Sequence, residues 1–220
     1  MLRRDFSLAA PALALVSAAA FTPRAQAQAQ AFKPNAGSDY YILDKPAPVE
    51  APAGKIEVVE FFWYKCQHCN TFEPALDAWS KKLAKDVVLR RVPIAFQDSF
   101  APQQRLFYAL DAMGLLPRLH AKVFNAIHVE RLNLDKGEAI IDWVAQQGVD
   151  RAKFAEQFNS FTIASKASKA TQLQNGYRVE GVPALGIAGR FYTDGSIAKS
   201  MDRALQVVDA LVADLRGKKI

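Results

Sequence analysis

The chain has 220 residues, of which 50% are hydrophobic, with two cysteines and a formal net charge of +6. This length suits one domain with a full core, or a domain that carries an insertion. The lysines and arginines are scattered among acids, unlike the clustered basic residues of a nucleic-acid-binding protein. Two cysteines are also too few for a small disulfide-rich scaffold, so the pair needs another explanation.

The N-terminal segment has the order of a secretory signal. Two arginines precede an apolar stretch from Phe6 to Phe21, and small-residue spacings then predict cleavage near Ala27 or Ala29. The apolar stretch is too short for a membrane-spanning helix, which needs roughly twenty apolar residues. We therefore expect a signal peptide over 1–27 and an exported protein. The start LRRDFSL also resembles a twin-arginine signal, so both export routes stay open.

An arm and a central strand follow the signal. Residues 28–55 are rich in proline and small residues, which indicates an N-terminal arm with a short edge strand at 40–43. The nearly continuous apolar run IEVVEFFW at 56–63 predicts a strand that is covered on both faces of a sheet.

A helix and a second strand complete the first structural unit. Apolar spacing predicts a helix from Gln67 to Lys85, with a kink near Pro74, and VVLRRVPI at 87–94 predicts a strand. This order gives a βαβ unit with a parallel pair of strands. The two cysteines then lie at the carboxyl end of a strand, where α/β proteins place reaction sites.

The second half of the chain is predominantly helical. Apolar residues recur at helical intervals from 99 to 164, and the breaks between them predict about four helices. The elements expected after this block are a helix at 166–177, a hairpin of strands at 184–187 and 190–193, and a closing helix at 198–215.

Cys66 and Cys69 are the only cysteines, and metal-binding interpretations of the pair fail on ligand count. Tetrahedral zinc needs four ligands, and the chain offers only three histidines without a zinc-type spacing. A c-type haem needs histidine where this chain has Asn70, and iron–sulfur clusters need more thiolates. An inert disulfide stays open as an alternative, although so short a loop stabilises little. A reactive dithiol fits the surroundings best.

The predicted position of Cys66 at the start of a helix favours its thiolate. Unpaired backbone N–H groups and the positive end of the helix dipole stabilise negative charge there. The dipole supplies about one pKa unit, and His68, between the cysteines, is the natural source of more. Cys69, one turn further along, is expected to be shielded. Each unit by which the pKa of Cys66 falls makes the disulfide more oxidising by roughly 30 mV.

Several motifs together resemble the DsbA family of periplasmic thiol-disulfide oxidoreductases. They are EFFWYKCQHCNTFEP, the long helical stretch, GVPALGIAGRFY and the final helix, in an order and spacing that match over about residues 40–215. The resemblance implies an α/β protein with a thioredoxin fold and an inserted all-helical domain. The implied domains are a discontinuous thioredoxin-like domain at 56–98 and 166–215 and a helical insertion domain at 99–165.

The resemblance also implies roles for individual residues. Cys66 and Cys69 form the redox-active disulfide in this interpretation. Pro183 follows a cis peptide bond, and the backbone of Val182 faces the dithiol and pairs with a substrate segment. Glu60 matches the family's buried acid, a lone carboxyl that is expected to have a raised pKa and to relay the proton of Cys69.

One position departs from the family pattern, and two others are ambiguous. Gln67 stands where the family prototype has proline, which puts the strength of oxidation and the substrate preference in doubt. An accessible apolar substrate face is expected around Trp63, Tyr64 and Val182. The first two residues are equally compatible with the core, because strand ends are commonly buried.

The sequence therefore predicts a periplasmic dithiol oxidase. Its predicted catalytic residues are Cys66, Cys69, His68 and Glu60, and its predicted substrate contacts are Val182, Pro183 and Gln67. The expected substrates are reduced, unfolded exported polypeptides, and the resemblance implies reoxidation by a DsbB-like quinone-linked membrane oxidase. We expect a monomer without a metal, a prosthetic group or a nucleic-acid partner. Two alternatives stay open: a disulfide reductase or isomerase of the same fold, and a non-catalytic periplasmic peptide-binding or chaperone module.

Overall fold

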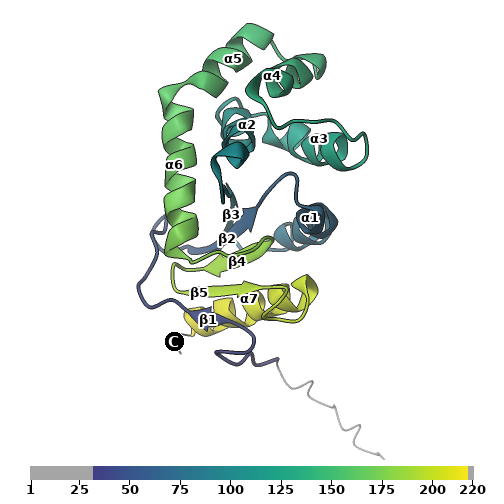
Figure 1. Ribbon diagram of the computed structural model, residues 1–220. Coiled ribbons are helices and arrows are strands. Elements are labelled where there is room, and N and C mark those ends of the chain that lie inside the picture. The colour runs from purple at the N-terminus through teal and green to yellow at the C-terminus, as the bar shows by residue number, and fades with distance from the viewer. Residues whose placement is uncertain (1–31, 218–220) are drawn as a thin grey trace, which may run out of the picture. The chain divides into compact units, whose positions relative to one another are not determined.

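A computed structural model describes residues 32–217 of the chain. The predicted signal peptide and its cleavage near Ala27 or Ala29 lie outside the described residues. A five-stranded sheet in the order β1-β5-β4-β2-β3 organises the described part (Figure 1). Within residues 32–217, no helix combines the length and the apolar character that a membrane crossing requires.

Strand β2, Ile56–Phe62, forms the centre of the sheet. It runs parallel to β3, Val87–Pro93, and antiparallel to β4, Ala184–Ile187. All residues of β2 after Ile56 are buried, as expected for a strand covered on both faces. Helix α1, Gln67–Ser80, connects β2 to β3, so the predicted βαβ unit is confirmed. The helix ends at Ser80, earlier than the predicted Lys85.

The predicted hairpin and edge strand are also present. Strand β5, Phe191–Asp194, pairs antiparallel with β4, and β1, Tyr41–Ile42, pairs antiparallel with β5. The hairpin turn contains Ala188 and Gly189, whose φ angles of 53° and 68° both lie in the left-handed region. Glycine favours this region because it has no Cβ, so the sequence itself specifies the turn.

Helices fill the chain between β3 and β4. They are η1 Asp98–Phe100, α2 Ala101–Ala112, α3 Leu116–His128, α4 Gly137–Gln146, α5 Arg151–Asn159 and α6 Phe161–Gly176. The predicted start of α6 at Lys166 is wrong, because Ser160 caps the helix and accepts a hydrogen bond from the backbone N–H of Ile163 at 3.2 Å. The helical stretch therefore continues into α6 after a single non-helical residue.

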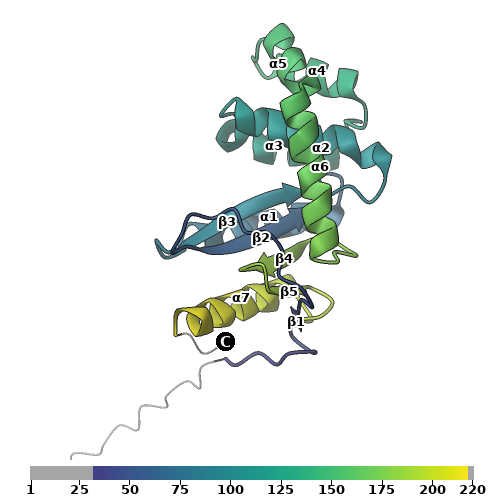
Figure 2. The same cartoon turned by 90° about the vertical axis from the view of Figure 1, so that its left-hand side faces the viewer.

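Three apolar clusters cover the sheet and its end. Helices α1 and α7, Met201–Arg216, pack on one face of the sheet, and α6 packs on the other (Figure 1). In Figure 2, α6 accordingly crosses in front of the sheet and α1 lies behind it. The third cluster joins helices α2 to α5 to Phe62, Tyr64 and Cys69. The dithiol therefore lies where the sheet meets the helical block.

Candidate active site

Cys66 is the residue that begins helix α1. It is the N-cap, and its sulfur accepts a hydrogen bond from the backbone N–H of Cys69 at 3.4 Å. Its own backbone N–H donates to the carbonyl of Trp63 at 3.0 Å, which ties the turn to the end of strand β2. The predicted location of Cys66, at a helix start and at the carboxyl end of a central strand, is confirmed. Neither cysteine is in a disulfide in this structure.

The surroundings of Cys66 stabilise its thiolate. Hydrogen bonding from the Cys69 thiol is the largest cause, followed by the backbone N–H groups of Cys69 and His68 and by the charge of His68. Together they outweigh partial burial and lower the pKa of Cys66 to about 6. His68 itself is exposed, so its effect on Cys66 comes from its backbone and its charge.

Cys69 has the opposite environment, because its side chain is 0% exposed and belongs to the apolar cluster under the helical block. Burial, hydrogen bonding with Cys66 and the charge of Cys66 raise the pKa of Cys69 well above its usual range. The charge of Glu60 raises it further. Two thiols three residues apart thus differ in both exposure and acidity, as the position on a helix start predicts.

The loop before strand β4 closes over the dithiol. The Val182–Pro183 peptide bond is cis, as the resemblance implies. In its thiol form Cys66 donates a hydrogen bond to the carbonyl oxygen of Val182 at 3.3 Å. His68, Val182 and Pro183 also line a cavity of about 330 Å³, together with Gly195 and Met201. The structure thus brings together residues more than a hundred positions apart in the sequence.

Glu60 is buried but it is not a lone carboxyl, so that part of the expectation is wrong. Its side chain is 1% exposed, and Arg91 Nε from the neighbouring strand donates to Glu60 Oε2 at 3.0 Å. Burial raises the pKa of Glu60 to about 8; Arg91 opposes this shift, and the charge of Glu73 adds to it. The predicted direction of the pKa shift is confirmed, because desolvation outweighs a single ion pair.

One residue that was expected on the accessible substrate face is buried instead. Tyr64 is 0% exposed and packs in the cluster under the helical block, so its placement on an accessible face is wrong. Trp63 is half-buried and stacks on Phe100 with the two ring centroids 3.8 Å apart. Both side chains thus brace the end of β2 against the helices, while the partly exposed Val182 stays beside Cys66.

Sequence reasoning missed His128, which contacts the dithiol loop from helix α3. Its Nε2 donates to the backbone carbonyl of Tyr64 at 2.8 Å, and its Nδ1 lies 3.1 Å from Gln67 Oε1. His128 therefore contacts the side chain at the position that departs from the family prototype. No local signal indicates this contact, since His128 stands 61 residues beyond Gln67.

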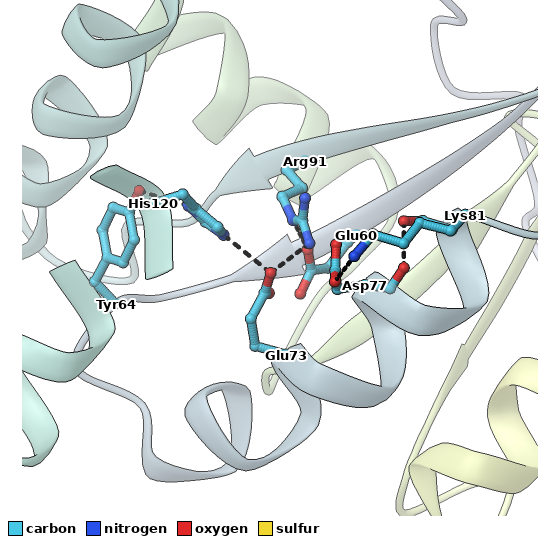
Figure 3. Close-up of polar contacts among 8 residues, drawn as sticks. Glu60, Tyr64, Glu73, Asp77, Lys81, Arg91 and His120 are labelled. Atoms are coloured by element: carbon cyan, nitrogen blue, oxygen red, sulfur yellow. Dashed lines mark hydrogen bonds and ion pairs between the residues drawn. The ribbon is translucent and has the colours of Figure 1, made fainter. Parts of the chain in front are cut away.

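Sequence reasoning also missed the partners of Glu60. Arg91 Nη2 donates to Glu73 Oε1 at 2.5 Å, so one guanidinium bridges the buried Glu60 and the partly buried Glu73 (Figure 3). Glu73 stands four residues after Cys69 in α1, which is one helical turn, and this spacing is a signal that could have found it. The pairing of Arg91 with Glu60 follows only from the register of β2 and β3.

Comparisons with known proteins agree with this geometry. The model of the DSBA-like thioredoxin domain matches residues 57–207. The thiol:disulfide interchange protein DsbA of Burkholderia cepacia is 40% identical over 194 residues, 88% of this chain and 92% of the relative. The protein of the same name from Bordetella pertussis is 42% identical over 207 residues, 93% of this chain and 94% of the relative.

Solved structures give the same result for the fold. The crystal structure of Pseudomonas aeruginosa DsbA matches with a TM-score of 0.80 and 39% identity, over 84% of this chain and 96% of that one. The oxidoreductase DsbA from Xylella fastidiosa matches with a TM-score of 0.78 and 32% identity, over 84% of this chain and 98% of that one. The predicted thioredoxin fold with a helical insertion is therefore confirmed. The chain belongs to the DSBA-like thioredoxin domain family.

Proposed function

We propose that this chain is a dithiol oxidase, which donates its Cys66–Cys69 disulfide to newly exported polypeptides through a mixed disulfide on Cys66. The contrast between the two sulfurs carries the proposal: Cys66 is partly exposed with a pKa of about 6, and Cys69 is fully buried with a raised pKa. A stabilised Cys66 thiolate favours the reduced form of the protein. Its disulfide is therefore a good electron acceptor.

The reaction begins when a substrate thiolate attacks the Cys66 sulfur of the oxidised protein. The Cys66–Cys69 bond breaks, its electron pair passes to Cys69, and a substrate–Cys66 disulfide forms. A second substrate thiol, after losing its proton, attacks the substrate sulfur of that bond. The substrate leaves with a disulfide, and Cys66 leaves as a thiolate. Two electrons have then moved from the substrate to the protein, and Cys69 has taken up a proton.

The buried acid supports the protonation of Cys69. Cys69 has a raised pKa and sits in an apolar cluster, so its sulfur cannot stay ionised after the disulfide opens. Glu60 lies close enough for its charge to raise the pKa of Cys69, and its own raised pKa makes it a proton donor near neutral pH. In this proposal Glu60 gives a proton to Cys69 when the disulfide opens and takes it back on reoxidation.

Substrate binding involves the loop at the cis peptide bond. Val182 is partly exposed beside the Cys66 sulfur, so its backbone can pair with an extended segment of an unfolded chain. The cavity next to His68 and Pro183 has room for a side chain of that segment. Gln67 is exposed at the same edge and contributes a polar contact.

The wider setting of the proposal comes from the family. We propose a monomer in the periplasm, whose partners are reduced, unfolded exported polypeptides and a DsbB-like quinone-linked membrane oxidase. We also propose the domain boundaries 56–98 and 166–215 for the thioredoxin-like domain and 99–165 for the insertion. The helical block between β3 and β4 supports this division, although α6 crosses the proposed boundary at 165.

The redox equilibrium of the dithiol with glutathione tests the proposal. A dithiol oxidase should already be reduced in glutathione mixtures that leave thioredoxin-like dithiols oxidised, and the ultraviolet absorbance of its thiolate should titrate near the pKa of about 6. A reductase or isomerase of the same fold would instead have a more reducing poise. A peptide-binding or chaperone module would keep its binding activity in Cys66→Ser, whereas an oxidase loses its activity.

A further inference from the structure

The buried polar cluster under the dithiol extends beyond Glu60 into the helical block. Figure 3 shows Arg91 between Glu60 and Glu73, and His120 on the far side of Glu73. His120 Nε2 from helix α3 lies 3.5 Å from Glu73 Oε1, and His120 Nδ1 is hydrogen-bonded to the hydroxyl of Tyr64 at 2.8 Å. Glu73 and His120 have side-chain exposures of only 14% and 9%. Tyr64 is fully buried.

Tyr64 determines where His120 carries its proton. Burial raises the pKa of Tyr64 well above its usual range, so the hydroxyl keeps its hydrogen. Within residues 32–217 the hydroxyl of Tyr64 has a hydrogen bond only with His120 Nδ1. The hydrogen of the hydroxyl has no other acceptor there, so the hydroxyl donates to Nδ1. Burial lowers the pKa of His120, and the imidazole is neutral with its hydrogen on Nε2. That N–H faces Glu73 Oε1 across 3.5 Å; the contact is electrostatic, because Nε2 has no hydrogen-bond partner among the described residues.

The contacts of the two carboxyl groups are unequal. Glu73 Oε1 is approached by Arg91 Nη2 at 2.5 Å and by His120 Nε2 at 3.5 Å. Glu60 is approached by Arg91 alone. Among the described residues Glu60 Oε1 and Glu73 Oε2 both lack a hydrogen-bond partner, so the two carboxyl groups differ in how many groups approach their other oxygen. One guanidinium cannot balance two negative charges here, where the side chain of Glu60 is 1% exposed and that of Glu73 is 14% exposed, so one carboxyl takes a proton. The unequal contacts decide which of the two carboxyl groups carries the proton.

We infer that His120, held by Tyr64, is a positioning residue whose Nε2–H faces Glu73 and thereby makes Glu60 the carboxyl that carries the proton at neutral pH. The charge of Glu73 is one of the causes that raise the pKa of Glu60, which agrees with this division. The inference deepens the proposed function and rests on it, because the proton of Glu60 matters there as the proton for Cys69.

The ionisable groups around the cluster leave few other sources for such an effect. Glu60 faces Arg91 from β3, and Glu73 and Cys69 from α1. His120 faces Glu73, Arg91 and Tyr64, and the remaining groups around its ring are aromatic: Phe62, Phe107 and Phe124. Further along α1, Asp77 and Lys81 pair with each other at 2.6 Å on the exposed side of the helix (Figure 3).

Infrared titration of the oxidised protein tests the inference. Neither cysteine titrates in this form, and subtracting the spectrum of Glu60→Gln isolates the carbonyl band of protonated Glu60. The wild type should lose this band with a midpoint near pH 8. Two variants separate the two nitrogens of His120. His120→Gln keeps an N–H near the position of Nε2, and His120→Asn keeps only a group that faces Tyr64.

His120→Asn should lower the midpoint by about one pH unit, because the N–H that faces Glu73 is lost and Glu60 is no longer the favoured site of the proton. His120→Gln should restore the wild-type midpoint, and so should the control Lys122→Gln, an exposed change on the same helix. Tyr64→Phe, which frees the proton of His120 to move to Nδ1, should lower it by less. Tyr64→Phe also keeps the inference testable if His120→Asn does not fold.

Three results would overturn the inference: no Glu60 band in the wild type at neutral pH, an unchanged midpoint in the folded variants, or equal shifts in His120→Gln and His120→Asn. The titration uses no substrate and no glutathione. A dithiol that proves to be reducing would therefore defeat the proposed oxidase function while the infrared midpoints stand on their own, so the two failures are distinguishable.

Discussion

Two glutamates on the central strand show how differently one sheet can use the same buried residue. Glu57 and Glu60 are both 1% exposed, and their odd separation on β2 places them on opposite faces of the sheet. Glu57 receives two hydrogen bonds from Arg90, at 3.0 and 2.9 Å, and one from the backbone N–H of Glu50 at 3.0 Å. Glu60 receives one hydrogen bond from Arg91, and its other oxygen is unpartnered within residues 32–217.

The difference follows from what each carboxyl group faces. Glu57 has two hydrogen bonds from Arg90, whose other partner is the exposed Glu50, and a backbone donor, so its negative charge is compensated and it serves as a structural ion pair. Glu60 shares its arginine with Glu73 and lies at the end of the strand that leads to the dithiol. Burial alone therefore does not make a carboxyl group reactive. Reactivity requires a negative charge that is incompletely compensated and that lies next to a reacting group.

The largest effect should come from the dithiol, on which the role of Glu60 depends. Cys66→Ser should abolish disulfide transfer, because no disulfide can form with Cys69 alone. Its thermal unfolding should stay close to that of the reduced wild type below about pH 6, where the Cys66 thiolate adds little stability, since Cys66 is partly exposed. Oxidation of a reduced, unfolded model protein, followed with circular dichroism of the variant, measures both properties. Residual oxidase activity would remove Cys66 from the mechanism.

Glu57→Gln should destabilise the fold and leave the rate of disulfide exchange unchanged. It leaves Arg90 without its bidentate partner, which should lower the free energy of unfolding by about 3 kcal/mol. This is the low end for a broken buried pair, because Arg90 also contacts Glu50 at 3.4 Å. Denaturant unfolding measures the loss. An exchange rate that fell together with stability would mean that the two glutamates do not have separate roles.

Glu60→Gln should slow disulfide exchange and leave the stability of the fold nearly unchanged. Gln resembles the protonated carboxyl group that burial favours at neutral pH, so the free energy of unfolding should change by less than about 1 kcal/mol. Exchange with a thiol substrate should slow by about ten- to a hundredfold, because Cys69 loses its proton donor. Stopped-flow kinetics measure the rate, with Glu57→Gln as the matched control. Unchanged rates would leave Glu60 with a structural role only.

The smallest expected effect is the dependence of stability on pH. The reduced protein gains stability from the lowered pKa of Cys66, in full above the ordinary thiol pKa of 9.0, and loses it as the pH falls through about 6. The oxidised protein has no such thiol. The stability of the reduced form relative to the oxidised form should therefore decrease as the pH is lowered from about 8 to about 6.

Unfolding curves of both redox forms at a series of pH values measure this dependence. The Glu60→Gln background is the appropriate one, because Glu60 titrates in the same window with a pKa of about 8. Parallel curves for the two forms would show that the Cys66 thiolate is not stabilised by the fold.

Local patterns were sufficient to predict most elements of the fold. The apolar run of β2, the turn at Ala188 and Gly189, and a cysteine at the start of α1 each depend on neighbours within a few residues. The start of α6 at Phe161 was also predictable from the sequence, since Ser160 is a preferred N-cap residue. It was missed because the apolar spacing of the helical block continues through it.

The site was predictable only where its residues are close in sequence or match a family motif. Cys66, His68 and Cys69 lie in one helical turn, and Val182 and Pro183 came from the resemblance. Arg91, Glu73, His120 and His128 come from three separate elements, and no pattern within any one of them indicates the others. Tyr64 was ambiguous for the same reason, because its burial depends on the helices that pack over it.

The sequence by itself determined a dithiol at the start of a helix, at the end of a buried strand, because helix starts, strand periodicity and cysteine spacing are local properties. Tertiary structure alone decided which side chains surround that dithiol and which of them pair with Glu60. The register of β2 with β3 gave Glu60 a shared arginine, and the packing of α3 brought His120 to Glu73 and His128 to Gln67. Burial and charge pairing set acidity through groups that are neighbours in space, and the chain order does not encode those neighbours directly.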